Sequence, residues 1–263
     1  MTITIIGSGN MGTALVKGFL QKKLVKPKDL IVTDQSEEKL KNIQKLGVWT
    51  STNNQKVLKS DILIFAVKPQ SFPELAKEIA KKIPKKTIVI SIMAGIGIGT
   101  MKQHLGHQRI IRSMPNTPAM VGEGVTGWFA DKSISASEKK KIQKLFESTG
   151  LAIEVKREDQ LNDFTALSGS GPGFFFYVFE QWLKAIRGLN IPNEQASKIL
   201  AKTLQGSLKL LETSGETPEK LRAKVTSKGG TTEAGLKILQ KAQLEKLFAK
   251  TLKTAYNRSK QLG

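Results

Sequence analysis

The segment that most constrains the fold is Gly7-Ser8-Gly9-Asn10-Met11-Gly12, which directly follows the apolar run ITII at residues 3–6. The run predicts a buried strand, and the residues after Gly12 have helical spacing. In such a unit the first glycine permits a tight turn, the second lets a pyrophosphate approach the backbone, and the third allows the helix to pack closely on the strand. The phosphates bind at the amino end of the helix. The segment predicts dinucleotide binding; the alternative is a glycine-rich turn without a ligand.

Short β-rich runs alternate with helical patterns up to about residue 155. The other candidate strands occupy residues 30–34, 62–67, 87–92, 109–113, 124–130 and 151–155. Several are nearly continuous runs of Ile and Val, which is typical of strands buried on both faces of a parallel sheet. We therefore expect an α/β domain of the Rossmann type over residues 1–158, with a parallel sheet covered by helices.

The pattern changes after residue 158, where strand signals stop. Helices are expected over residues 159–168, 171–189, 192–213, 218–226, 232–241 and 243–262. Pro192 and Pro218 stand at first-turn positions, where a missing N–H is tolerated. Residues 159–263 are therefore expected to form an all-helical second domain.

The composition excludes several kinds of site. The chain has 263 residues, no cysteine and two histidines, so disulfides, thiolate metal sites and cysteine nucleophiles are excluded and no metal centre is expected. Its apolar runs fall far short of the ~20 residues of a membrane span. The first residues lack the basic region and cleavage site of a signal peptide, so we expect a cytoplasmic protein.

The net charge of +20 is also typical of nucleic-acid-binding proteins. The lysines are, however, scattered at helical spacing, and no run exceeds the three at positions 139–141. We therefore favour a solvated basic surface, whose field attracts anionic cofactors and substrates.

Asp34 and Ser36 follow the second predicted strand, where dinucleotide folds contact the adenine ribose. A carboxylate there hydrogen-bonds the 2′-hydroxyl of NAD and repels the 2′-phosphate of NADP, whereas Ser36 and Lys39 could accept a phosphate. The sequence slightly favours NADH but leaves the choice between NAD and NADP open. Asp34 or Ser36 could instead cap the following helix.

Two more strand ends carry candidate ligand-binding residues. Ala66-Val67-Lys68-Pro69 stands where ligands of open α/β sheets bind, and Lys68 could donate a proton, contact cofactor hydroxyls or face solvent. The segment from Arg112 to Pro118 contains two prolines, which make it rigid and suited either to ligand binding or to a plain strand-exit turn.

Two segments of the helical part also contain candidate ligand-binding residues. Ser168-Gly169-Ser170-Gly171-Pro172-Gly173 leads into a long helix, and Ser227 to Thr232 connects two helices. Backbone N–H groups of a Gly-Gly turn entering a helix form an anion-binding nest, which here is surrounded by hydroxyls and suits a carboxylate. A helix cap built from threonines is the alternative.

In this order and at these intervals, the segments GSGNMG, AVKP, MPNTP, SGSGP and SKGGTTEAGLKIL resemble the pyrroline-5-carboxylate reductase family over essentially the whole chain. The resemblance implies an oxidoreductase of proline biosynthesis that reduces 1-pyrroline-5-carboxylate to L-proline with NADPH or NADH. It also implies a helical dimerisation domain, a homodimer or larger homo-oligomer, and an active site shared between subunits. Lys228 and Gly173 depart from the usual proline and alanine.

The resemblance also assigns site residues. The cofactor would be lined by Gly7 to Gly12, Asn53, Ala66 to Pro69 and Ala94, with Met114, Pro115 and Asn116 on the nicotinamide side. The substrate carboxylate and ring nitrogen would be held by Ser227, Gly229, Gly230, Thr231 and Thr232, with Thr232 as the catalytic hydrogen-bond partner of the nitrogen.

Two other functions stay open at this point. One is another reductase on the same architecture, such as a β-hydroxyacid dehydrogenase, for which Lys184 is the candidate proton donor. The other is a basic nucleic-acid-binding protein that has kept the dinucleotide fold.

Overall fold

The computed structural model describes residues 1–262, apart from the side chains of residues 56, 57 and 187. The chain divides by packing into two compact units, one containing residues 1–172 together with the segment from Lys253 onward, and the other Gly173–Leu252. The domain boundary between residues 158 and 159 stays a prediction, because packing units and domains need not share their limits.

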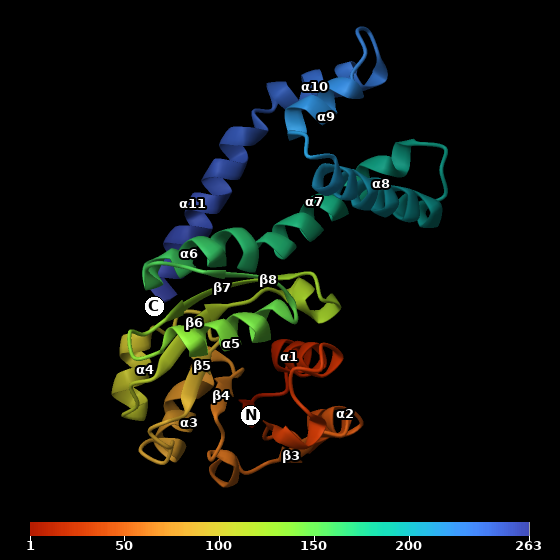
Figure 1. Ribbon diagram of the computed structural model, residues 1–263. Helices are drawn as coiled ribbons and strands as arrows, with labels where there is room; N and C mark the ends of the chain where they lie inside the picture. Colours follow the sequence, from red (N-terminus) through yellow and green to blue (C-terminus); the bar gives the residue numbers. More distant parts are fainter. Residues whose placement is uncertain (263) are drawn as a thin grey trace. The chain divides into compact units, whose positions relative to one another are not determined.

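The first unit is built on an eight-stranded sheet with the order β3-β2-β1-β4-β5-β6-β7-β8 (Figure 1). Strands β1 to β6 run parallel, β7 is antiparallel to β6, and β8 is parallel to β7. The predicted α/β architecture is confirmed, but the sheet is mixed rather than wholly parallel. The strands are β1 (Ile3–Ile6), β2 (Leu30–Thr33), β3 (Trp49–Ser51), β4 (Ile62–Phe65), β5 (Ile88–Ser91), β6 (Ile110–Met114), β7 (Gly124–Ala130) and β8 (Gly150–Glu154).

Two differences from the predicted sheet have local causes. Residues 115–123 alone connect β6 to β7, which is shorter than the dozen or so residues that a helical crossover between parallel strands requires. The antiparallel direction of β7 follows from this short connection. The sequence does not predict β3, because this short strand at the edge of the sheet begins with Trp49, which is 55% exposed, and lacks a buried apolar pattern.

Helices cover both faces of the sheet. One core packs α1 (Asn10–Gln21), α2 (Glu37–Gln44) and α5 (Ala136–Glu147) against side chains such as Ile62 and Ile64. The other packs α3 (Phe72–Ile79) and α4 (Ile98–Leu105) against Leu63 and Phe65. Because successive strand residues point to opposite faces, the continuous apolar run of β4 supplies both cores. Each fully buried side chain of this size contributes about 1.5–3 kcal/mol.

The rest of the described chain is helical, which confirms the predicted second part. After β8 come α6 (Leu161–Phe164), a π-helical turn (Thr165–Gly169), α7 (Gly171–Ala185), α8 (Asn193–Ser214), α9 (Pro218–Lys224), α10 (Thr231–Lys241) and α11 (Leu244–Leu262). Pro218 begins α9 behind the capping side chain of Thr217, whereas Pro192 is itself the N-cap of α8. None of the described helices combines the length and apolar character needed to cross a membrane.

Glu138 fastens the start of α5 to the sheet. It forms a capping box with Ser135, and its Oε1 accepts a 2.6 Å hydrogen bond from Nη2 of Arg109, the residue before β6. The bond from Arg109 is the largest of the effects that lower the pKa of Glu138 to about 2 from an ordinary value of 4.5.

We predict that Glu138→Gln lowers the free energy of unfolding by about 1–2 kcal/mol at pH 7, since a charged hydrogen bond is lost at a partly exposed position. A lowered pKa in the folded state stabilises the fold above pH 4.5, and this contribution is lost as the pH falls toward about 2. The difference between wild type and variant in urea unfolding should therefore shrink below pH 4.5. The matched control is Glu147→Gln on the same helix, where the carboxylate accepts, within the described residues, only from Gln143. A difference that stayed constant with pH would contradict the prediction.

Candidate active site

The glycine loop between β1 and α1 leaves a helix amino end free. Gly7 has a φ of 109°, which an L side chain rarely adopts, and its N–H donates to the Thr33 carbonyl oxygen at 2.7 Å. Gly9 is the N-cap of α1, which has no side-chain cap and no acidic residue in its first turn. The first N–H groups of the helix are therefore available to an anion.

The three glycines differ in the space around them. A Cβ at Gly7 would overlap the Ala66 carbonyl oxygen, and one at Gly12 would overlap the Gly7 carbonyl oxygen. Their backbones lie too close together for any side chain. A Cβ at Gly9, by contrast, would meet no atom within 4 Å, because this glycine faces open space. The space at Gly9 fits a pyrophosphate group against the backbone.

Asp34, which follows β2, holds the glycine loop in place. Its Oδ2 accepts from both the backbone N–H and the hydroxyl of Ser8, each at 2.8 Å, and its Oδ1 accepts from the Ser36 N–H at 3.0 Å. Partial burial acts to raise the pKa of Asp34, but these hydrogen bonds outweigh burial and lower it, so the group is a carboxylate. The cap of α2 is Ser36, whose hydroxyl accepts from the Lys39 N–H.

A cavity of about 520 Å³ opens beside the loop. It is lined by six of the residues predicted to bind the cofactor: Gly7, Gly9, Asp34, Ala66, Val67 and Lys68. Lys39, which the sequence indicates as a possible phosphate partner, also lines it. Sequence reasoning missed several other residues that line it, including Gln35, Asn54, Ser71, Glu74 and Glu78. Its size suits part of a dinucleotide, and Lys39 and Lys68 offset part of the negative charge of Asp34, Glu74 and Glu78 in its lining.

Asn54, rather than the predicted Asn53, lines this cavity. Asn54 is buried, and it accepts from the Thr33 hydroxyl at 2.7 Å and donates to Glu78 at 3.2 Å. The exposed Asn53 side chain accepts from the Gln55 N–H, two residues further on, and its predicted cofactor contact stays a prediction. The Asn-Asn pair marks this turn in the sequence, but only the fold shows which of the two faces the cavity.

Of the other predicted cofactor residues, Asn10, Met11 and Gly12 begin α1, Ser36 caps α2 and Pro69 begins a short 3-10 turn after Lys68. Four more lie at the same carboxyl edge of the sheet. Ala94 follows β5, while Met114, Pro115 and Asn116 end or follow β6. Asn116 is buried and uses both ends of its amide within the protein: Nδ2 donates to the Ser168 carbonyl oxygen at 3.0 Å, and Oδ1 accepts from the Val125 N–H at 2.7 Å. It joins the MPNTP segment to the π-helical turn, and its predicted cofactor contact stays a prediction.

The turn predicted to bind the substrate enters α10 in the second unit. Gly229 has a φ of 73°, and its N–H donates to the Glu233 carboxylate at 2.9 Å, while the Gly230 N–H donates to the Ser227 carbonyl oxygen at 3.0 Å. Two donors of the predicted nest are therefore used internally. The structure gives the N–H groups of Thr231 and Thr232, the first residues of α10, no acceptor within the part of the chain that it describes.

Comparison with known proteins identifies the family. Pyrroline-5-carboxylate reductases from Staphylococcus haemolyticus and from Staphylococcus aureus strain COL are each 38% identical to the chain over 267 residues, covering 100% of the chain and 98% of each relative. The chain belongs to the pyrroline-5-carboxylate reductase family. A model described as pyrroline-5-carboxylate reductase dimerisation matches residues 158–262, and one described as NADP oxidoreductase coenzyme F420-dependent matches residues 2–95.

Solved structures of pyrroline-5-carboxylate reductases agree over the full length. The enzyme from Coxiella burnetii is 35% identical with a TM-score of 0.92, covering 100% of this chain and 98% of the other. The enzyme from Plasmodium falciparum, solved with NADP bound, is 26% identical with a TM-score of 0.89 and the same coverage. The one from Streptococcus pyogenes is 29% identical with a TM-score of 0.87, covering 99% and 98%.

Family membership confirms the function predicted from the motifs. The chain is an NAD(P)-dependent oxidoreductase that reduces 1-pyrroline-5-carboxylate to L-proline. The competing assignment to a β-hydroxyacid dehydrogenase has no support at Lys184, which is exposed on α7 and paired with Glu180.

We predict that alanine at one glycine of the loop weakens cofactor binding and that alanine at another lowers the stability of the fold. Gly9→Ala should leave the melting temperature unchanged, since its Cβ meets no protein atom within 4 Å. It should weaken NADH binding roughly ten- to a hundredfold, because the methyl group lies where the pyrophosphate approaches. Gly12→Ala should instead lower the melting temperature, because its Cβ overlaps the Gly7 carbonyl. Fluorescence titration and thermal unfolding measure the two effects; an unchanged dissociation constant for Gly9→Ala would exclude the binding-loop assignment.

Proposed function

We propose that the reduction takes place at a site with two parts. The cavity beside the glycine loop binds the cofactor, and the turn at Ser227 to Thr232 binds the substrate. The single observation that supports this most is the pair of unused N–H groups of Thr231 and Thr232 at the start of α10, with both threonine side chains exposed. A helix start with free donors suits a carboxylate.

The substrate carboxylate binds at this helix start. Glu233 already satisfies the Gly229 N–H, so the donors left for the substrate are the N–H groups of Thr231 and Thr232. Glu233 is itself neutralised in part by Lys237, at 3.5 Å. Lys228, which stands where the family has proline, adds a positive charge next to the turn and favours the anionic substrate.

The Thr232 hydroxyl is the hydrogen-bond partner of the ring nitrogen. A cyclic imine becomes electrophilic when its nitrogen is protonated, and the positive charge then belongs to the substrate. The site consequently needs a neutral partner that orients the ring rather than a strong acid. Bound NAD(P)H supplies the hydride. Positioning of the ring by Thr231 and Thr232 provides most of the rate.

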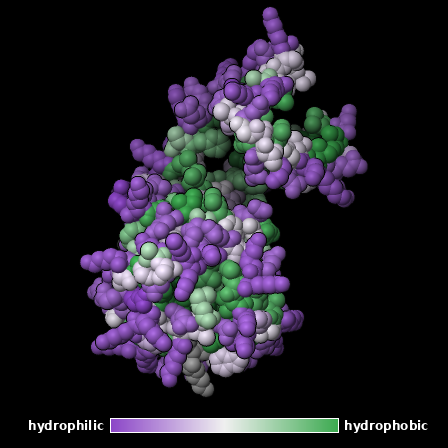
Figure 2. All heavy atoms as spheres, viewed as in Figure 1, coloured by the Kyte–Doolittle hydropathy of each residue, from purple (hydrophilic) through white to green (hydrophobic). Residues whose placement is uncertain are grey.

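The protein works as a homodimer or a larger homo-oligomer of such dimers. The second unit has little core of its own: among its described residues, Ala196 and Leu200 are the only buried apolar side chains. Figure 2 shows apolar side chains gathered on the surface of the helices. On α7 the exposed ones are Phe175, Phe176, Tyr177, Val178 and Trp182, and further along the helices they include Ile199, Leu208, Leu210, Ile238, Leu239, Leu247 and Phe248.

Helices with this much exposed apolar surface are stable only when another surface covers them. The match of residues 158–262 to a dimerisation model supports a second copy of the chain as that surface. We further propose that the substrate-binding turn of one subunit serves the cofactor cavity of its partner.

We predict that Asp34→Ser shifts the ratio of kcat/KM values for NADPH and NADH toward NADPH by roughly five- to a hundredfold, which corresponds to about 1–3 kcal/mol of repulsion between the carboxylate and a 2′-phosphate. Asp34→Asn is the companion variant, because it removes the charge but keeps one acceptor, for either Ser8 or Ser36, where the carboxylate has two. Steady-state kinetics with both cofactors measure the ratio. If neither variant moves it, Asp34 acts only by holding Ser8 and Ser36 in place.

We predict that Thr232→Ala lowers kcat/KM for 1-pyrroline-5-carboxylate roughly ten- to a thousandfold, through loss of one or two hydrogen bonds to a charged group at about 1.5–3 kcal/mol each. Its dissociation constant for NADH should stay unchanged.

Mixing Thr232→Ala with Gly9→Ala subunits tests the shared site. If each site draws on two chains, some mixed dimers contain one site with both parts intact, and activity rises above that of either parent. A mixture no more active than its parents, with subunit exchange demonstrated by mass spectrometry, would mean that each site is built within one chain.

A further inference from the structure

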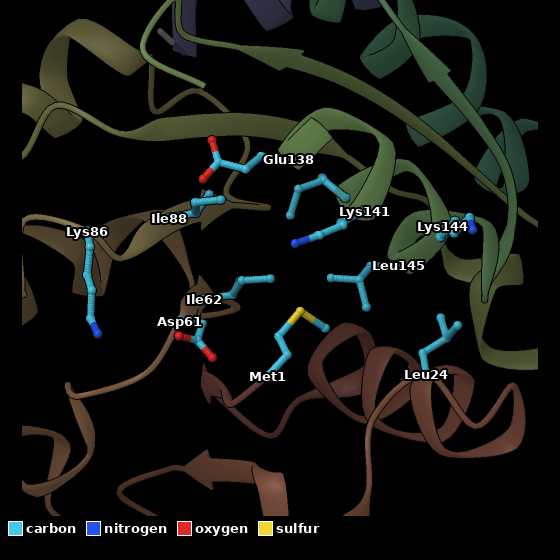
Figure 3. Close-up of a pocket in the computed structure, with 11 residues that line it drawn as sticks. Met1, Leu24, Asp61, Ile62, Lys86, Ile88, Glu138, Lys141, Lys144 and Leu145 are labelled. Atoms are coloured by element: carbon cyan, nitrogen blue, oxygen red, sulfur yellow. The ribbon is translucent and has the colours of Figure 1, made fainter. Parts of the chain in front are cut away.

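A second cavity, of about 500 Å³, lies at the opposite edge of the sheet from the cofactor loops. It is bounded by residues at the amino ends of the strands, such as Ile62 at the start of β4 and Ile88 at the start of β5, and by one side of α5. We call it the amino-edge pocket. Its lining residues are Met1, Leu24, Asp61, Ile62, Lys86, Ile88, Glu138, Lys141, Ile142, Lys144 and Leu145 (Figure 3).

The floor of the amino-edge pocket is aliphatic. Ile62, Ile88, Ile142 and Leu145 are core residues, each less than a tenth exposed, and the pocket reaches their outer surfaces. No aromatic side chain lines it among the described residues, so it offers no ring on which a nucleobase could stack. Such a floor suits a flexible hydrocarbon chain, and the volume lies within the range of roughly 300–1,000 Å³ that is usual for small-molecule sites.

The rim has an excess of positive charge. Lys86, Lys141 and Lys144 line the pocket, and within the described part of the chain no acceptor is found for the ammonium groups of Lys141 and Lys144. In Figure 3 the Lys141 ammonium points into the space beside Ile62 and Leu145.

The two carboxylates of the rim already have partners. Asp61 accepts from the Thr2 N–H at 2.8 Å and from its hydroxyl at 3.3 Å. The hydrogen bond from the Thr2 N–H is the largest effect that lowers the pKa of Asp61, and the charges of the amino terminus and Lys86 add to it. Glu138 is held by Arg109 and Ser135. Lys141 and Lys144 are therefore left to attract an external anion.

We propose that the amino-edge pocket binds an aliphatic carboxylate, with its hydrocarbon chain on the floor of Ile62, Ile88 and Leu145 and its carboxylate beside Lys141 and Lys144. This ligand differs in class from the cofactor and from the cyclic imine. The pocket also lies apart from the loops at the carboxyl ends of the strands.

Octanoate is the probe, and titration calorimetry is done with excess L-proline so that the substrate-binding turn does not compete for the probe. We expect one saturable octanoate site per chain. Acetate, which lacks the chain, and 1-octanol, which lacks the charge, should each bind at least about tenfold more weakly.

Charge reversal locates the site. Lys141→Glu should weaken octanoate binding roughly five- to tenfold, because an attraction becomes a repulsion at a partly hydrated position. Lys140→Glu is the matched control: it makes the same charge change on the same helix, but Lys140 lines a different hollow. Both lysines are exposed, so both variants should fold, and thermal unfolding verifies this.

Methyl NMR of the unmodified protein gives an independent readout. Octanoate should shift the Ile62 and Ile88 methyl signals and leave that of Ile98, on α4 across the sheet, unchanged. The proposal is overturned if octanoate does not saturate, if Lys141→Glu and Lys140→Glu have the same effect, or if the shifts occur only outside the amino-edge pocket.

Discussion

The rest of this structure depends on the close approach of three backbone segments at the carboxyl edge of the sheet. Gly7 lies against the Ala66 carbonyl, and Gly12 lies against the Gly7 carbonyl, so the β1–α1 turn, the first turn of α1 and the end of β4 share a space that has no room for a side chain. Asp34 fixes the same turn from the β2 side through Ser8. The helix start that faces the cofactor cavity is therefore rigid before any ligand arrives, which is what tight positioning requires.

Features that depend on local chemistry could be predicted from the sequence. The glycine loop follows from the steric needs of one turn, and the buried strands follow from runs of branched aliphatic residues such as those of β4 and β5. The helical second part follows from helical spacing and from the loss of such runs. In each case a short stretch of chain contains both the pattern and its cause.

Features that depend on more than one element of the fold could not be predicted in the same way. The direction of β7 depends on the short connection between β6 and β7. The length of this connection can be used only once the ends of both strands are known. Asn54 rather than Asn53 faces the cavity because Thr33 and Glu78, both far away in the sequence, hold its amide. The use of the Gly229 N–H by Glu233 depends on the way in which the turn enters α10.

The amide of Asn116 restricts which substitutions the protein can accept at this position. Its Oδ1 and Nδ2 bind different segments, β7 through Val125 and the π-helical turn through Ser168. Aspartate retains the acceptor but no donor, serine is too short to reach both partners, and glutamine is one carbon too long. A lineage that replaces this asparagine must therefore reshape two loops in the same step. Because both partners are backbone groups, these bonds restrict the residue type at position 116 and not at positions 125 and 168.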